Sequence, residues 1–96
     1  MQIGKVVGTV ISTNKDHKLE GLKLQVVKYV SPEGKPTGGF IIAVDSIGAG
    51  TEEIVLVATG SSARQTTTTD GKPVDAVIMA IVDSLEVDGK TQYNKS

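Results

Sequence analysis

The 96-residue sequence contains no cysteine and no tryptophan, and aromatic side chains make up 3% of it. Without cysteine, the chain has no disulfide scaffold, no cysteine-ligated zinc and no thiol nucleophile. A surface that stacks nucleobases needs several aromatic faces, whereas this chain has only Phe40, Tyr29 and Tyr93. Ten basic against 11 acidic side chains leave a net charge of −1, without the positive excess that phosphate backbones attract. We therefore expect no nucleic-acid partner.

Long apolar runs are also missing from the sequence. No stretch approaches the ~20 apolar residues of a membrane-spanning helix. Residues 1–5 lack the basic flank and following apolar region of a signal peptide. A mass of 10.0 kDa allows one domain with a single core. We expect one cytoplasmic domain over residues 1–96, with no membrane contact and with a polar tail from about residue 88.

Val, Ile and Thr are frequent in most segments of the chain, and these residues favour strands. Turn signals rich in Pro and Gly, such as residues 31–34, separate the apolar segments. The sequence predicts a mainly β protein with five strands, at residues 2–13, 22–30, 40–45, 53–59 and 75–87. The Val and Ile spacing within 74–87 also fits an apolar helix, which is the alternative for that segment.

The segments between and after these strands carry turn and helix signals. Ser62 and Gln65 match a capping box, which predicts one short helical turn. The four threonines that follow, together with residues 70–73, predict a mobile loop that packs no core. Asp88 and Gly89 predict a hairpin-type turn, and residues 90–96 are predicted to add at most a short strand.

The fourth and fifth predicted strands are apolar on both faces. Ile54, Leu56 and Ala58 alternate with Val55 and Val57, and the fifth strand carries Ile78, Ala80 and Val82 on one face and Val77, Met79 and Ile81 on the other. A domain of this size has one core, and an uncovered second face would exceed the apolar patch that a soluble monomer tolerates. The pattern predicts an oligomer in which a neighbouring subunit covers the second face. A helix over the last segment would cover it within the monomer instead.

Catalytic and metal-binding patterns are weak in this sequence. Ser61 and Ser62 follow a glycine, but the second glycine of a nucleophile elbow is absent. His17 lies among lysines, as a solvated surface histidine does. Residues 48–50 (Gly-Ala-Gly) are not followed by the pattern of a phosphate-binding loop. We expect no enzyme activity, no catalytic residue, no metal and no cofactor.

Three segments together form a recognisable pattern: residues 44–50 (VDSIGAG), residues 60–65 (GSSARQ) and residues 73–83 (PVDAVIMAIVD). Residues 4–10 (GKVVGTV) and the strand around Leu22 and Leu24 agree with it. The sequence resembles the pentameric vertex proteins of bacterial microcompartment shells, which include those of ethanolamine compartments and carboxysomes. The resemblance extends over about residues 1–87.

This resemblance implies a five-stranded, OB-like β-barrel that assembles into a cyclic homopentamer. It also implies that the pentamer closes the vertices of an icosahedral shell in the cytoplasm, whose facets are built of hexameric and pseudohexameric shell proteins. A cyclic contact that closes after five steps gives a ring rather than a filament. An OB-like binding module for a nucleic acid or a peptide is the alternative function.

The resemblance and the strand pattern nominate two sets of residues. By the resemblance, the residues near the narrow central opening are Ile47, Gly48, Ala49 and Gly50. The subunit-contact candidates are Ser61, Ser62, Ala63, Arg64 and Gln65 by the resemblance, and Val77, Met79 and Ile81 by the two-faced strand pattern. Arg64, the chain's one arginine, is either a surface charge or a bidentate anchor to the next subunit.

Overall fold

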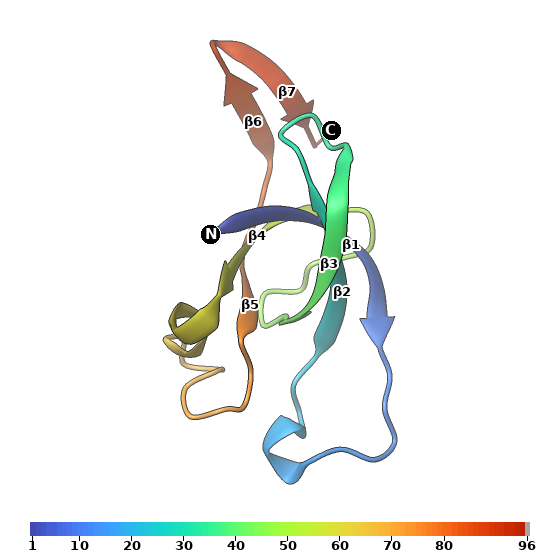
Figure 1. The fold of residues 1–96 in the computed structure, drawn as a ribbon, viewed down its shortest axis with the longest axis vertical. Coiled ribbons are helices and arrows are strands. Elements are labelled where there is room, and N and C mark those ends of the chain that lie inside the picture. Colours follow the sequence, from blue (N-terminus) through green and yellow to red (C-terminus); the bar gives the residue numbers. More distant parts are fainter. Residues whose placement is uncertain (96) are drawn as a thin grey trace.

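The computed structural model describes residues 1–95 as a small β-barrel with a hairpin projecting from one end (Figure 1). The molecule measures 45 × 24 × 24 Å, and the hairpin extends its long axis. In chain order the elements are β1 (Gln2–Val10), η1 (His17–Leu19), β2 (Leu24–Val30), β3 (Pro36–Val44), β4 (Ile54–Thr59), η2 (Gly60–Arg64), β5 (Ala76–Ile81), β6 (Ser84–Val87) and β7 (Lys90–Asn94).

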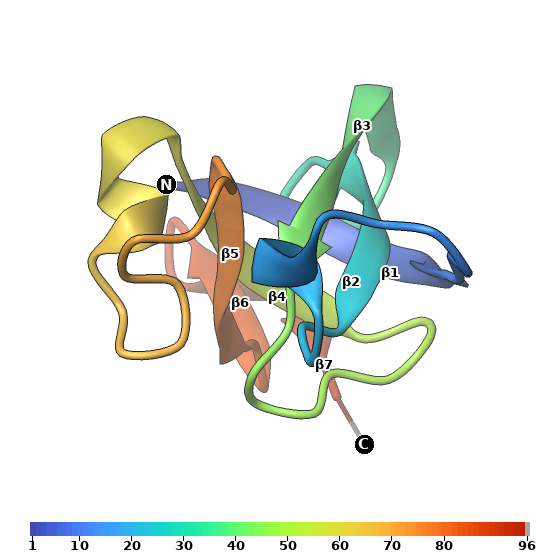
Figure 2. The same cartoon turned by 90° about the horizontal axis from the view of Figure 1, so that it is seen from below.

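The five longer strands close into a barrel in the order β1-β2-β3-β5-β4. Their neighbours are antiparallel, except that β3 meets β5 in parallel at Val44 and Val77. Figure 2 shows the closed ring of strands from below, with η1 beneath it. The expected five-stranded, mainly β barrel is confirmed, and both helical segments within residues 1–95 are short 3-10 turns.

Inward-facing side chains of the alternating strands fill the barrel, as period-two patterning requires. The fully buried residues of this barrel core are Val6, Val27, Ala43, Ala49, Val55, Val57, Ala76 and Ile78. Gly4 lies against this core, because a Cβ built at Gly4 would collide with Cγ1 of buried Val27. Close approach of β1 to β2 at this point therefore depends on glycine.

The fifth strand is shorter than expected, and the prediction of one strand over 75–87 is wrong. β5 ends at Ile81, and the chain then leaves the barrel to form the separate β6–β7 hairpin. The predicted turn is confirmed, with φ of 54° at Asp88 and 75° at Gly89, the left-handed geometry of tight hairpin turns. The short strand expected in the tail is β7, while Ser96 lies outside the described residues.

The predicted short helical turn is confirmed as η2, but its predicted N-cap is wrong, and so is the expectation that the threonine loop buries no side chain. Thr59, not Ser62, is the N-cap of η2, and the Ser62 hydroxyl donates back to the Thr59 carbonyl at 2.7 Å. In the threonine loop, Thr69 is fully buried, and its backbone N–H donates to Oγ1 of Thr66 at 3.1 Å. The hydroxyl groups of Thr66 and Thr69 lie 2.5 Å apart, within hydrogen-bond distance. Because these bonds satisfy the polar atoms of Thr69, its side chain can be buried.

The second apolar face of β4 is covered within the protomer rather than by a neighbour. Ile54 packs in a cluster with Val30 and Val82, against which Leu85 and Tyr93 of the hairpin lie. Ala58 packs in another cluster, with Val44, Val77 and Ala63 of η2. The inference that these residues need a second subunit is therefore wrong for most of them. The alternative of a helix over residues 74–87 is also wrong, because that segment forms β5 and β6.

Candidate functional site

The loop between β3 and β4 is held rigidly by the carboxylate of Asp45, which is 5% exposed. Its Oδ1 accepts the backbone N–H groups of Ile47 and Gly48, both at 3.0 Å. Its Oδ2 accepts Nε2 of Gln25 at 3.1 Å, and Nζ of Lys23 lies 4.0 Å away. Aspartate suits this position because its short carboxylate reaches backbone N–H groups two and three residues ahead.

Gln25, on β2, connects this loop to the barrel wall. Its Nε2 also donates to the carbonyl of Ala49 at 2.8 Å, and its Oε1 accepts the hydroxyl of Thr9 on β1 at 2.7 Å. The residue is buried and its amide is satisfied at both ends, as a buried polar group must be to avoid a desolvation cost. The network fixes the loop to two strands at once.

The far end of the loop is fixed by Glu53. Its Oε1 accepts the backbone N–H of Gly50 at 2.6 Å, and its Oε2 pairs with the ammonium group of Lys95. The hydrogen bond from Lys95, and then the one from Gly50, hold the pKa of Glu53 below its ordinary value. The same bond raises the pKa of Lys95. This ion pair also ties the end of the β6–β7 hairpin to the loop.

The four central-opening candidates do not lie in equivalent environments. Ile47, Gly48 and Gly50 are exposed, whereas Ala49 is buried in the barrel core. Gly48 has φ of 83°, a left-handed conformation that favours glycine. The loop therefore presents Ile47, Gly48 and Gly50 to its surroundings and uses Ala49 as its anchor.

The candidates on η2 divide in the same way. Ser61, Ser62, Arg64 and Gln65 are exposed, while Ala63 is fully buried under them. Nη1 of Arg64 donates to the carbonyl of Val74 at 3.0 Å, which joins η2 to the segment leading into β5. Arg64 thus has a contact within its own protomer.

The three β5 candidates do not share one face, contrary to the alternating pattern. Val77 is fully buried beneath η2, Met79 is 43% exposed, and Ile81 is partly buried against the barrel core. The reason is a register shift: Ile78 pairs with Val57 and Ala80 with Leu56, so Met79 is an extra, bulged residue. A bulge reverses the inward and outward parity of the residues after it.

Sequence analysis missed an exposed apolar surface on the outside of the first three strands. We call it the β1–β3 face, and its members are Val7, Val26, Phe40 and Ile42. Phe40 is 66% exposed, although it is the only phenylalanine in the chain. Adjacent apolar pairs, Val26-Val27 and Ile41-Ile42, were the available signal, since one member of each pair must point outward.

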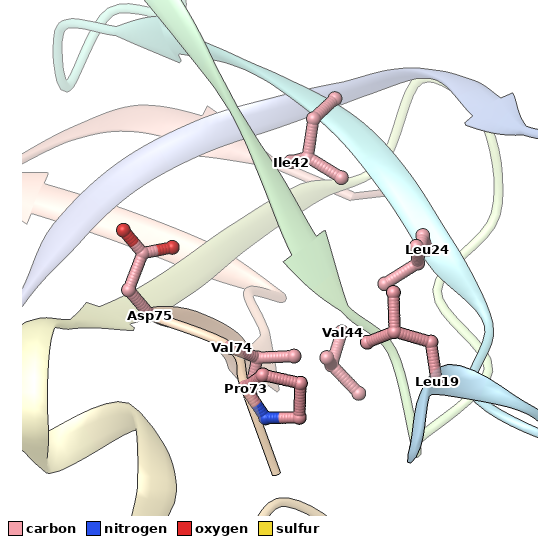
Figure 3. Close-up of a pocket in the computed structure, with 7 residues that line it drawn as sticks. All are labelled: Leu19, Leu24, Ile42, Val44, Pro73, Val74 and Asp75. Carbon is pink, nitrogen blue, oxygen red and sulfur yellow. The ribbon is translucent and has the colours of Figure 1, made fainter. Parts of the chain in front are cut away.

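A hollow of about 180 Å³ adjoins this face where β3 approaches β5. Leu19, Leu24, Ile42 and Val44 line one side, and Figure 3 shows Pro73 and Val74 opposite Val44, with the Asp75 carboxylate at the edge. Nearly all of this lining is apolar, which suits a packed side chain better than a charged ligand.

No group of three His, Asp or Glu side chains that could hold a metal ion occurs among residues 1–95. No helix in that part of the chain is long and apolar enough to cross a membrane. The candidate site comprises the loop fixed by Asp45 and Gln25, the exposed side of η2 and the β1–β3 face.

Comparison with known proteins gives matches over nearly the whole chain. The carboxysome shell vertex protein CcmL of Nostoc sp. is 45% identical over 96 residues, which cover 99% of this chain and 95% of that protein. The microcompartment shell vertex protein GrpN of Rhodospirillum rubrum is 48% identical over 86 residues, covering 90% and 97%.

Comparison with solved structures identifies the same relatives. The structure of Nostoc sp. CcmL has a TM-score of 0.94 and covers 99% of this chain and 100% of its own. The pentameric microcompartment shell protein GrpN from R. rubrum has a TM-score of 0.82 at 45% identity, covering 91% and 99%. The family model described as ethanolamine utilisation protein EutN/carboxysome matches residues 1–83. With the barrel, its motifs and these full-length relatives in agreement, the chain belongs to the EutN/CcmL family.

Proposed function

We propose that this chain is a structural protein: five copies form a closed ring that caps a vertex of a bacterial microcompartment shell. The observation that carries the proposal is full-length similarity to shell vertex proteins, including the pentameric GrpN. We propose hexameric and pseudohexameric shell proteins as its neighbours. A fivefold unit inserted into a flat hexagonal sheet forces curvature, which a closed shell requires at its vertices.

The proposed ring uses the two residue sets named above. Exposed residues of η2, with Met79 nearby on the outside of the barrel, belong to the contact between protomers in this proposal, and Arg64 is its polar member. The loop bearing Ile47, Gly48 and Gly50 borders the central opening. Its anchoring by Asp45 and Gln25 supports that placement, because a loop at the rim of a narrow opening must hold its shape.

The binding-module alternative has less support. The exposed face of β1, β2 and β3 is where such a module would bind a strand, and here it is apolar with one aromatic side chain, Phe40. Lys5, beside this face, is already paired with Glu52 at 3.2 Å. Lys28 lines the same face and is its other basic side chain. One aromatic ring and two lysines, one of them paired, do not make the aromatic platform and basic groove that nucleic acid requires. The same surface suits another protein subunit.

Native mass spectrometry at micromolar concentration tests the ring. A closed ring has five times the 10.0 kDa mass of one chain, and we expect that species to dominate. A stable monomer would contradict the proposal. Mixing with single-stranded DNA at low salt serves as the control for the alternative, which requires a salt-sensitive complex.

Co-expression with hexameric shell proteins tests the position of the ring at vertices. We expect closed polyhedral shells by electron microscopy when this chain is present, and open sheets or tubes when it is omitted. Equally closed shells in both cases would overturn the vertex role while leaving the ring itself intact.

A further inference from the structure

The two halves of the loop between β3 and β4 are fixed by different carboxylates. The first half is held by Asp45, whose fully buried side chain accepts the backbone N–H groups of Ile47 and Gly48. In the second half, the N–H of Gly50 donates to Oε1 of Glu53 at 2.6 Å. The Glu53 side chain is 21% exposed. One carboxylate is therefore sealed inside the barrel, whereas the other is in contact with water.

The exposed carboxylate of Glu53 is held by a residue from the far end of the chain. Its Oε2 pairs with the ammonium group of Lys95, which lies 42 positions later in the sequence. Within residues 1–95, Lys95 is the only basic side chain that pairs with Glu53, because the nearby Lys5 pairs with Glu52 at 3.2 Å. The orientation of the Glu53 carboxylate therefore depends on the β6–β7 hairpin.

The base of the hairpin places Lys95 independently of this ion pair. The N–H of Val82 donates to the carbonyl of Ile54, and the N–H of Lys95 donates to the carbonyl of Asp83, both at 2.8 Å. Apolar side chains of the hairpin pack against the cluster that contains Ile54. Figure 1 shows β7 running back from the tip of the hairpin towards the barrel. Backbone and apolar contacts thus deliver the ammonium group to Glu53.

The turn between Gly50 and Glu53 adopts a strained conformation. Glu52 has φ of 77°, in the left-handed region that favours glycine. Its N–H donates to the carbonyl of Val6 at 2.7 Å, and its carboxylate pairs with Lys5. A non-glycine residue keeps such a conformation only where the surrounding contacts hold it. The bond from Gly50 to Glu53 spans this turn, so losing that bond removes one of the contacts that hold it.

We propose that Lys95 and Glu53 are positioning residues, through which the β6–β7 hairpin sets the place of Gly50 at the rim of the central opening. The location at the rim rests on the proposed function, whereas the coupling of the hairpin to the loop does not. Lys95 orients the carboxylate of Glu53, and that carboxylate holds the N–H of Gly50. The half of the loop at Gly48 is independent of the hairpin, because Asp45 has its own buried partners.

Amide hydrogen exchange measured by NMR on the full chain tests this coupling, with Gly50 and Gly48 as the two probes. Lys95→Met keeps a long side chain but removes its charge. We expect exchange at Gly50 to become about tenfold faster, because its bond to a charged acceptor weakens, and exchange at Gly48 to stay unchanged. Lys90→Met is the matched control, since Lys90 is exposed on the same hairpin, and it should change neither amide.

Two further variants separate positioning of the loop from simple attachment of the hairpin. Lys95→Arg keeps a cation, so it should retain the wild-type exchange rate at Gly50. The double variant Glu53→Lys with Lys95→Glu keeps an ion pair between the hairpin and the loop but removes the acceptor for Gly50. Exchange at Gly50 should therefore be fast in the double variant. If it does not fold, Glu53→Ala replaces it, with the same fast exchange expected.

Four outcomes would overturn the proposal. They are an unchanged rate at Gly50 in Lys95→Met, an equal acceleration at Gly48, fast exchange at Gly50 in Lys95→Arg, and a wild-type rate at Gly50 in the double variant. Native mass spectrometry of the same samples tests the ring separately. A wild-type chain that stays monomeric would refute the proposed pentamer, while the two amides would still report the coupling within that monomer.

Discussion

The side-chain amide of Gln25 donates to the carboxylate of Asp45 at 3.1 Å, and both side chains are buried. This bond links a barrel strand to the loop that carries Ile47, Gly48 and Gly50. The loop is therefore part of the rigid barrel and not an appended connection. Shape at this end of the protein is set by a polar network inside it.

Removing the Gln25 amide should destabilise the barrel. Gln25→Leu removes the amide donor from Oδ2 of Asp45 and from the buried Ala49 carbonyl, while Oδ1 keeps its two backbone donors. We expect a cost of about 2–4 kcal/mol in the free energy of unfolding. Urea denaturation measures the change. Gln2→Leu, at an exposed position of β1, is the matched control and should stay within about 0.5 kcal/mol. Equal effects of the two changes would show that the network adds no stability.

Two glycines of β1 should respond differently to the same substitution. Gly4→Ala forces its Cβ against Val27, a stiff and fully buried side chain, and should cost about 1–3 kcal/mol. Gly8→Ala meets open space and should be neutral or slightly stabilising. Thermal or chemical unfolding of both variants decides the matter. A tolerated Gly4→Ala would mean that β1 and β2 approach less closely than the structure indicates.

Stability should fall in acid through the Glu53–Lys95 pair. The folded state lowers the pKa of Glu53, so the pair contributes fully above the unfolded value of roughly 4.3 and is lost as pH falls through the lowered folded value. The raised pKa of Lys95 predicts that stability also falls in alkali. The contribution of Lys95 to stability is fully present below the unfolded lysine pKa of roughly 10.4, and it is lost as pH rises through the folded value.

Unfolding titrations between pH 3 and pH 11, spanning roughly the Glu and Lys ranges, measure both limbs. Glu53→Gln should flatten the acid limb. Glu86→Gln, an exposed carboxylate on the hairpin, is the control and should leave the wild-type profile. An unchanged profile in Glu53→Gln would show that the pair is too solvated to matter.

Neighbouring residues of β5 should separate folding from assembly. Ile81→Asp places a charge against the barrel core and should lower the free energy of unfolding by about 3 kcal/mol or more. Met79→Asp, two residues earlier and exposed, should leave the fold intact and act on the ring instead. Circular dichroism with native mass spectrometry distinguishes the two effects. Similar behaviour of both variants would contradict the outward bulge at Met79.

Arg64→Ala should act at two levels. Loss of the bond to the Val74 carbonyl should cost about 0.5–1.5 kcal/mol of stability. In the proposed ring the same change weakens the contact between protomers while the circular dichroism spectrum stays largely intact. Dilution followed by native mass spectrometry measures the ring, and Lys72→Ala in the adjacent loop is the control. A ring of wild-type stability would show that Arg64 serves its own protomer alone.

The sequence by itself determined the mainly β class, the approximate positions of the barrel strands, the Asp88-Gly89 turn and the family. Alternating side chains and turn residues are local signals, so they are readable without knowing what packs where. The family resemblance rested on three short segments that recur together, and the full-length relatives confirm it.

Only the tertiary structure decided which apolar faces are covered. Ile54 and Ala58 looked unpartnered, yet the hairpin that ends near residue 94 and the turn η2 cover them from elsewhere in the chain. The bulge at Met79 reversed the expected orientation of Ile81, which faces the barrel core. Val77 is buried beneath η2 and not exposed to a neighbouring subunit. Periodicity reports the conformation of a segment, whereas burial depends on remote segments that pack against it. The uncovered β1–β3 face therefore emerged only from the closed barrel.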